Sequence, residues 1–230
     1  MKTISYHYKL LTEILRLPVA ELHFHEALDP ADIRATYRYY TKPHPRYKLI
    51  RNKTVGAALL DLNAVPNEQQ YLELIKGKNA GAYHAKRARS RGYQLRHIDR
   101  NAHIDDIYAI NTSLEERQGR PMDAKYREKP SHFDTLKHFR YYGVFNPEGR
   151  MVAYANLGHY GNFASFSQLI GIRNNDGIMH MMVVDIVSEL LGEQRVRYLM
   201  YDTFFGAQPG LQTFKKILGF RPYRAKYALQ

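Results

Sequence analysis

The stretch from Met151 to Gly177 constrains the fold of this chain more than any other part. It contains two aromatic-rich apolar segments, 151–159 and 163–171, separated by a Gly-Asn pair that is typical of a hairpin turn. A polar loop follows, and residues 178–191 then have the apolar periodicity of a helix. A strand that leads through a polar loop into a helix is a common phosphate-binding arrangement, because the first helical turn has free N–H groups and a partial positive charge. The stretch therefore predicts a ligand site where the second strand meets the helix.

The predicted elements after residue 92 follow the order β-α-α-β-β-β-α-β-α-β. This order predicts an α/β (α+β) fold, in which a mixed, mostly antiparallel sheet is flanked by helices, rather than a doubly wound parallel sheet. We predict strands at 93–99, 140–145, 151–159, 163–171, 196–201 and 222–229, and helices at 103–118, 131–139, 178–191 and 209–218.

Residues 1–92 predict an N-terminal extension of helices and a β-hairpin, packed on a core formed by residues 93–230. Within the extension, Asp29 and Pro30 suit the cap and the first position of a helix. Its predicted elements are a helical or mixed segment at 1–45, a hairpin at 46–62 and two helical runs between 66 and 91.

The composition limits the classes of function. With 34 Lys and Arg against 22 Asp and Glu, the formal net charge is +12, which favours polyanions such as nucleic acid, anionic lipid or phosphorylated cofactors. The alternative is a basic but otherwise ordinary soluble enzyme. The absence of cysteine excludes disulfides, thiolate zinc sites and a cysteine nucleophile.

Targeting, membrane and metal signals are absent from the sequence. No apolar run approaches the roughly 20 residues of a membrane helix, and the N-terminus makes a poor signal peptide. We therefore expect a cytoplasmic protein with no membrane span. The 11 histidines show no H-E-x-x-H spacing, so we predict no catalytic metal.

A basic stretch extends from Lys76 to Arg100, with Asp99 as its only counter-charge. Lysine and arginine bind phosphates, and the interleaved aromatic residues can stack on exposed bases. The stretch predicts contact with tRNA or another nucleic acid, and the alternative is a solvated helix face. The residues predicted to bind the polyanion or an acceptor are Lys86, Arg87, Arg89 and Arg91.

From residue 93 to 229 the order of elements resembles the GNAT fold of acyltransferases. The run from Gly210 to Phe220 is similar to the last helix and strand of that superfamily, which typically close with a Gly-Phe pair. In members that use acetyl-CoA, the position four before the glycine is often a tyrosine that can protonate the departing thiolate, whereas here it is Lys215. The pair Phe214-Lys215 resembles the FemABX branch, which transfers amino acids from aminoacyl-tRNA.

The resemblance leaves the donor open between an acyl-CoA and an aminoacyl-tRNA. The pyrophosphate loop of the superfamily corresponds to Arg173–Met179, where one glycine is shifted and the second is missing. Glycines in such a loop let the backbone approach phosphate closely. Asp176 would repel a phosphate, or else it caps the following helix. Arg173, Gly177, Ile178 and the helix N-terminus remain as predicted donor contacts.

Amide formation by direct transfer needs a neutral amine, a polarised carbonyl and close positioning. Lys215 is predicted to stabilise the developing oxyanion or a departing ribose oxygen; the alternative is a solvated lysine beside Lys216. Asp202, at the end of an apolar strand, is predicted to accept the amine proton, or else to cap the next turn. Tyr201 is a predicted proton donor, although with 19 tyrosines a structural role is the alternative.

Further donor contacts are predicted along the second strand of the hairpin. The backbone N–H groups of a splayed strand can hold the donor carbonyl, and Phe214 either stacks on the donor or packs in the core. In the first turn of the following helix, His180 suits a neutral base or a partly buried histidine. The predicted strand residues are Gln168, Leu169, Ile170 and Gly171.

Arg117 and Arg120 lie in a Gly- and Pro-containing loop, where they are predicted to bind an acidic acceptor or simply to flank a tight connection. The resemblance, together with these residues, implies an acyltransferase that forms an amide by moving an acyl or aminoacyl group from a CoA thioester or an aminoacyl-tRNA to a small-molecule amine. The alternative is a nucleic-acid-binding or nucleobase-modifying protein on a GNAT-like scaffold. The sequence does not indicate the oligomeric state.

Overall fold

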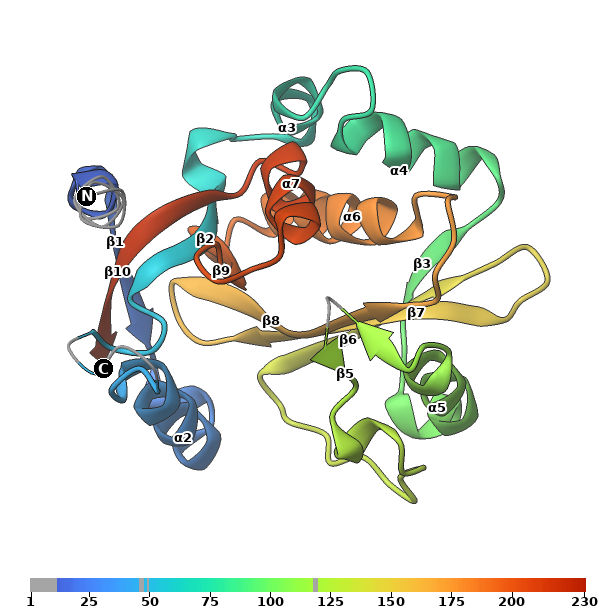
Figure 1. Ribbon diagram of the computed structural model, residues 1–230, viewed down its shortest axis with the longest axis horizontal. Coiled ribbons are helices and arrows are strands. Elements are labelled where there is room, and N and C mark those ends of the chain that lie inside the picture. The colour runs from blue at the N-terminus through green and yellow to red at the C-terminus, as the bar shows by residue number, and fades with distance from the viewer. Residues whose placement is uncertain (1–11, 46–47, 49, 118–119) are drawn as a thin grey trace, which may run out of the picture.

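The computed structural model of the protein describes residues 12–45, 48, 50–117 and 120–230 (Figure 1). An eight-stranded mixed sheet has helices on both sides. Its strands are β1 (Val19–Phe24), β10 (Arg221–Leu229), β2 (Val55–Asp61), β9 (Tyr198–Thr203), β8 (Phe163–Gly171), β7 (Met151–His159), β6 (Phe139–Phe145) and β3 (Gln94–His97), in that spatial order. The α-helices are α2 (Pro30–Thr41), α3 (Glu68–Leu74), α4 (Gly81–Ser90), α5 (Ile104–Thr112), α6 (Ile178–Glu193) and α7 (Pro209–Ile217).

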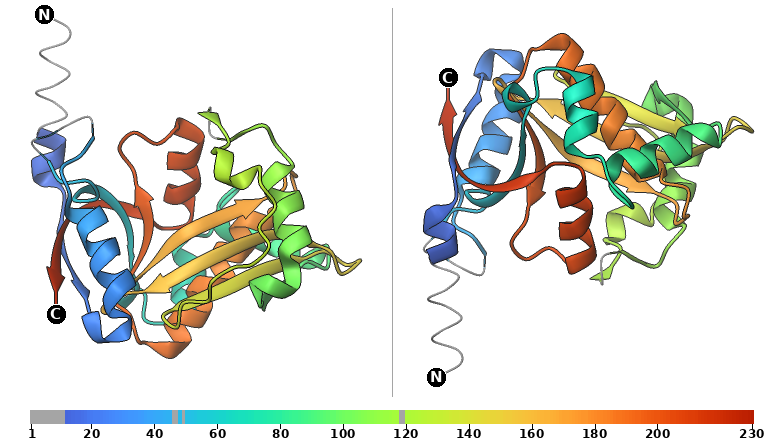
Figure 2. Two further views of the ribbon diagram at one scale, coloured as in Figure 1. Left: turned by 90° about the horizontal axis from the view of Figure 1, so that it is seen from below. Right: turned by 90° about the horizontal axis from the view of Figure 1, so that it is seen from above.

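The pairings in the sheet confirm the predicted mixed, mostly antiparallel architecture. Among the described strands, only the β1–β10 and β8–β9 pairs are parallel. The C-terminal strand β10 lies between β1 and β2, so both ends of the chain contribute to one sheet (Figure 2). The boundary between residues 92 and 93 stays a prediction, with strands from both sides of it in the same sheet.

The main core lies between the sheet and α6. Strand β7 is buried along eight of its nine residues, because helices cover both faces of the sheet at this point. Nine apolar residues of α6 are buried, since the helix is enclosed by the sheet, α3 and α4. A helix that is apolar around most of its circumference is stable only when it is buried in this way.

Helices α2 and α5 cover the opposite side of the sheet. Under α2, an aromatic cluster is centred on Phe24, whose ring lies 5.0 Å from Phe163 and 5.7 Å from Tyr40. Asp29 caps α2 by accepting a hydrogen bond from the Asp32 N–H at 3.2 Å, and Pro30 is the first helical residue, as predicted. The cap and the cluster together fix α2 against the sheet.

Two predictions in the N-terminal extension are corrected. The hairpin at 46–62 is wrong, because β2 pairs with β9 and β10; residues 46, 47 and 49 lie outside the described residues. Strand β1 lies in a segment predicted as helical or mixed. Its alternating burial depends on pairing with β10, some 200 residues away, which local sequence does not reveal.

The helix predicted at 131–139 is also wrong. Its backbone hydrogen-bonds with side chains instead: the Phe133 N–H donates to Asn101 Oδ1 at 2.8 Å, and the Leu136 N–H donates to Tyr141 Oη at 3.1 Å. The helix predicted at 103–118 is shorter, since α5 ends at Thr112. The small hairpin of β4 (Glu116–Arg117) and β5 (Arg120–Pro121) follows it.

Candidate active site

The two parallel strands β8 and β9 separate halfway along their length. They pair only where Phe163–Ser165 faces Tyr198–Met200, and no pairing between these fully described strands continues beyond that point. Each strand has a register shift where they part: Gln168 and Phe166 of β8 face consecutive residues of β7, and β9 has an extra residue between Met200 and Thr203. Such bulges bend a strand and interrupt its ladder. The carboxyl ends of β8 and β9 therefore form the two edges of an opening in the sheet.

Two cavities meet at this opening. The larger has a volume of about 750 Å³ and lies toward α4 and α6; the smaller has about 210 Å³ and lies toward the segment after β5. Leu169, Tyr201 and Leu211 line both of them. One ligand in each cavity would thus approach the other at the split between the strands.

The first turn of α6 forms one wall of the larger cavity. No side chain among the described residues caps this helix, so its first N–H groups remain available to a ligand. Gly177 precedes it with φ +88°, and a Cβ there would lie 2.3 Å from the His84 carbonyl oxygen. The glycine is thus required for the close approach of α4 to α6. Arg173 lines the cavity and is exposed, while Ile178 is buried.

The carboxylate of Asp176 has partners within the chain. Its carboxylate forms an ion pair with Arg91 and accepts a hydrogen bond from Tyr93 Oη at 2.7 Å. The repulsion between Asp176 and a bound phosphate, expected from sequence, is reduced by this pairing.

Two histidines stack on the wall of the larger cavity. The ring centroids of His84 and His180 are 4.4 Å apart, and His180 lies 4.7 Å from the Phe214 ring. Burial, with a smaller contribution from His84, lowers the pKa of His180 to about 4. Its imidazole is therefore neutral at pH 7, and its buried Nδ1 has no hydrogen-bond partner among the described residues.

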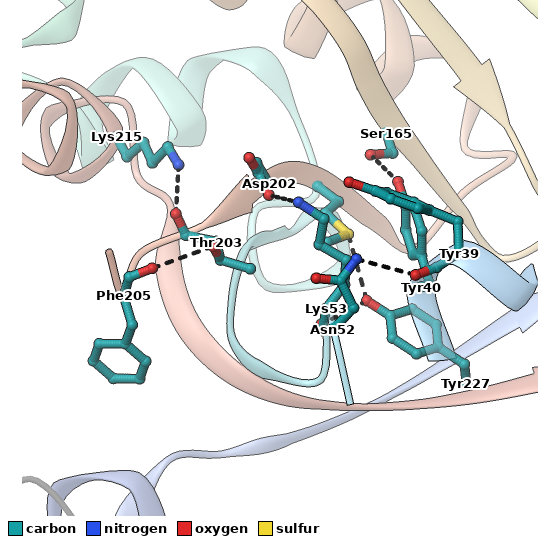
Figure 3. A network of polar contacts seen from close by, with 11 residues as sticks. Tyr39, Tyr40, Asn52, Lys53, Ser165, Asp202, Thr203, Phe205, Lys215 and Tyr227 are labelled. Atoms are coloured by element: carbon teal, nitrogen blue, oxygen red, sulfur yellow. Dashed lines mark hydrogen bonds and ion pairs between the residues drawn. The ribbon is translucent and has the colours of Figure 1, made fainter. Parts of the chain in front are cut away.

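Lys215 lies in the smaller cavity with only 1% of its surface exposed. Its Nζ donates a hydrogen bond to the Thr203 carbonyl oxygen at 2.7 Å (Figure 3). The same Nζ lies 4.7 Å from the centre of the Tyr201 ring. Burial lowers the pKa of Lys215 to about 8; the Asp202 charge opposes this and Lys53 adds to it. The alternative of a solvated lysine is wrong.

Asp202 adopts an unusual backbone conformation at the bulge of β9. Its φ is +53°, in the left-handed region that residues other than glycine rarely adopt. Strained residues of this kind cluster at functional sites. The side chain lines the smaller cavity and pairs with Lys53 rather than with the turn that follows.

Tyr201 separates the two cavities. Its ring lies 5.9 Å from Phe220 and 6.2 Å from Phe214, which lines the larger cavity. Burial and the charge of Asp202 raise the pKa of Tyr201, so its phenol stays protonated at neutral pH. A protonated hydroxyl can donate a hydrogen bond to a ligand at the split.

The predicted residues of β8 lie along the edge of the split. Leu169 and Gly171 line the larger cavity, and Gln168, Leu169 and Ile170 line the smaller one. The Gln168 side chain is fixed at both ends: Nε2 donates to Tyr126 Oη at 3.1 Å, and Oε1 accepts from Asn156.

The basic residues of α4 and Arg91, which follows the helix as its C-cap, have different partners. Arg89 pairs with Asp185 of α6, and Arg91 pairs with Asp176. Arg87 lines the larger cavity and forms no ion pair within the described part of the chain, while Lys86 is exposed.

The remaining predicted residues, Arg117 and Arg120, face each other across the β4–β5 hairpin, and their side chains lie outside the described part. The structure also places His84 on the wall of the larger cavity, Tyr126 on the wall of the smaller one and Lys53 beside Asp202. Sequence reasoning assigned no chemistry to Lys53 and Tyr126, because no motif or spacing links them to Lys215.

Within the described ranges, no three His, Asp or Glu side chains gather as a metal site. None of the described helices combines the length and apolar character needed to cross a bilayer.

Comparisons with known proteins give likeness in structure alone. No family model matches the sequence, and neither does any curated protein. FemX aligns with a TM-score of 0.57 at 12% identity, covering 73% of this chain and 59% of FemX. A conserved Bacteroides thetaiotaomicron protein of unknown function aligns with a TM-score of 0.50 at 13% identity, covering 72% of this chain and 56% of that protein. L-PGS from Bacillus licheniformis aligns with a TM-score of 0.48 at 17% identity, covering 74% of this chain and 58% of L-PGS.

The chain thus spans less than two thirds of the length of each of these structures. At such identities the likeness establishes the fold and nothing finer. The split parallel pair, the helix that starts beside it and the likeness to FemX show that this chain has a GNAT-type fold of the kind found in FemX.

Proposed function

We propose that this protein is an acyltransferase that forms an amide, by moving an acyl or aminoacyl group from a bound donor to an amine acceptor. The observation that carries the proposal is the pair of cavities that meet at the split between β8 and β9. Group transfer between two substrates requires two sites with one point of contact, so that the reacting atoms are held together. A module that only binds one ligand has no need of the second cavity.

The larger cavity takes the donor. Its volume of about 750 Å³ is within the range of sites for cofactor-sized ligands. Arg87, Arg173 and the uncapped first turn of α6 supply positive charge and N–H donors for phosphate. An acyl-CoA and the 3′ end of an aminoacyl-tRNA both carry phosphate next to the reactive group, so either fits this chemistry.

The smaller cavity takes the amine. The amine nitrogen attacks the donor carbonyl carbon held along β8, and the bond from that carbon to sulfur or oxygen breaks. Lys215, as an ammonium, stabilises the developing oxyanion or gives a proton to the departing atom, and Asp202 accepts the proton from the amine. Tyr201 donates a hydrogen bond at the split.

The alternative, a nucleic-acid-binding protein on this scaffold, receives less support. That alternative depends on Arg87, Arg89 and Arg91 as phosphate contacts. Two of these three, Arg89 and Arg91, pair with carboxylates of the same chain. Contact with the phosphates of a tRNA-borne donor remains compatible with the exposed Lys86 and with Arg87.

The proposal is tested by thermal unfolding with acetyl-CoA and, separately, with a non-hydrolysable aminoacyl-tRNA analogue. A donor present at 100 times its Kd stabilises the native state by about 2.7 kcal/mol, which corresponds to a rise of roughly 5–10 °C for a chain of this size. Mass spectrometry of an amine library incubated with the donor that binds should then show an acylated product. If neither donor raises the melting temperature and no product forms, the proposal is wrong.

A further inference from the structure

Lys53 pairs with Asp202, which lines the smaller cavity, although Lys53 belongs to the turn before β2, more than 160 residues before Lys215 in the chain. Its Nζ pairs with the Asp202 carboxylate, and its side chain is 17% exposed. In Figure 3, Asp202 lies between Lys53 and Lys215. Two amines and one carboxylate therefore share this corner of the site.

The backbone of Lys53 is fixed by two other elements. Its N–H donates to the Tyr40 carbonyl oxygen of α2 at 3.0 Å, and its carbonyl oxygen accepts a hydrogen bond from Tyr227 Oη of β10 at 2.9 Å. The neighbouring Asn52 Nδ2 donates to the Tyr39 carbonyl oxygen at 3.0 Å. The Lys53 side chain thus extends to Asp202 from a defined starting point.

Lys215 has a different partner. Its Nζ donates to the Thr203 carbonyl oxygen, and it forms no ion pair with Asp202 in the described structure. Burial lowers the pKa of Lys215; the charge of Asp202 opposes this, and the charge of Lys53 adds to it. The other titratable groups around the smaller cavity are Asp123, Tyr126 and Tyr201.

We infer that Lys53 is a positioning residue, which holds the Asp202 carboxylate away from the Lys215 amine and so keeps Lys215 ready to release a proton. The role of that proton in transfer rests on the proposed function. An amine that formed a direct ion pair with Asp202 would keep its proton more firmly, because the neighbouring negative charge favours the ammonium form.

The proton balance of the step is simple. The acceptor nitrogen bonds to the carbonyl carbon, the bond to the leaving sulfur or oxygen breaks, and the Lys215 ammonium protonates the leaving atom. The acceptor nitrogen loses one proton to Asp202, which passes it to solvent, and Lys215 regains one from solvent. A general acid is most effective when its pKa is near the working pH, as that of Lys215 is.

The test is an NMR titration of the full chain labelled at lysine Cε and Nζ, with the Lys215 signal assigned by its loss in Lys215→Arg. In Lys53→Met, Asp202 is released and a positive charge is lost, so the pKa of Lys215 should rise by about one pH unit. Lys53→Arg keeps the charge and the ion pair and should keep the wild-type pKa. Lys42→Met is the matched control. Lys42 Nζ lies 4.7 Å from the centre of the Tyr39 ring, which Lys53 also contacts, but Lys42 forms no ion pair with Asp202.

The inference is overturned if Lys215 titrates in folded Lys53→Met as it does in the wild type. Lys53→Gln replaces Lys53→Met should the latter unfold; if both unfold, Lys53 is only structural and the inference also fails. The titration needs no substrate, so it separates this inference from the proposed function. A shifted pKa without any detectable transfer by the wild type would support the role of Lys53 and refute the proposed activity.

Discussion

Lys215 lines the smaller cavity, whereas Arg89 and Arg91 lie at the C-terminal end of α4, and the surroundings of these cations differ. Lys215 is buried, has a carbonyl oxygen as its hydrogen-bond partner, and has a pKa lowered to about 8. Arg89 and Arg91 are exposed at the surface and pair with carboxylates. Burial without a carboxylate partner makes a cation reactive, whereas pairing at the surface makes it part of the packing between helices.

The largest effect that this contrast predicts concerns Lys215. In Lys215→Met the rate of transfer should fall by about 100-fold or more, because a preorganised cation at the developing charge is lost. Stability should not fall, since Met has a similar volume and removes a buried charge. Initial rates and urea unfolding measure the two effects.

The pH profile gives a second readout of the same group. The wild-type rate should decline as pH rises through about 8, where the ammonium form is lost. Lys216→Met, a change at the exposed neighbour, should retain activity. A Lys215→Met variant with more than about a tenth of the wild-type rate would show that Lys215 stabilises no transition state.

The next effect concerns the close contact between α4 and α6. In Gly177→Ala, the added Cβ would meet the His84 carbonyl oxygen at 2.3 Å in a left-handed backbone conformation. We expect a loss of about 2–3 kcal/mol in the free energy of unfolding. Gly210→Ala is the matched control: no atom lies within 4 Å of its Cβ position in α7, so stability should stay the same or rise by about 0.5 kcal/mol. Equal stability of the two variants would mean that α4 and α6 are not in this contact.

A third prediction uses the pH dependence of stability to test whether His180, on the wall of the larger cavity, is shielded from water. The folded pKa of His180 is about 4, below its unfolded value of 6.5, so the unfolded chain binds more protons between these values. Stability should therefore be lost as pH falls from about 6.5 to 4, by about 2 kcal/mol for this residue.

In His180→Gln this loss should be smaller, but not absent, because burial also lowers the pKa of His159 to about 4. Urea unfolding at pH values from 4 to 7 measures the loss of stability. His132→Gln, at an exposed loop residue, serves as the control. If His180→Gln leaves the slope unchanged, the His180 ring is solvated.

The smallest effects separate the arginines of α4 from one another. Arg89→Ala should lower stability by about 1 kcal/mol, because it leaves the half-buried Asp185 without its partner. Arg87→Ala should leave stability unchanged but weaken binding of a phosphorylated donor by about tenfold, or about 1.4 kcal/mol. Calorimetric titration with the donor and urea unfolding distinguish the two. Equal effects of both variants on both measurements would abolish the contrast between pairing and binding residues.

Much of the core was predictable from sequence because its signals are local. Strands β7 and β8 match their predicted bounds to the residue, since two apolar runs flank a Gly-Asn turn. The start of α6 and the cap of α2 were also predicted, because a helix N-terminus depends on a few adjacent residues. The residue pattern around Lys215 identified the position that the structure places in the smaller cavity.

Only the tertiary structure decided the environment of these residues. Burial makes Lys215 acidic, the bulge of β9 turns Asp202 into the cavity, and pairing with Asp202 gives Lys53 a place at the site. Only the fold brings Arg89 to Asp185 and Arg91 to Asp176. The sequence determined which chemical groups are present and where each element begins. Their pKa values and partners depend on contacts between segments up to 160 residues apart, because desolvation and charge interactions are properties of neighbours in space.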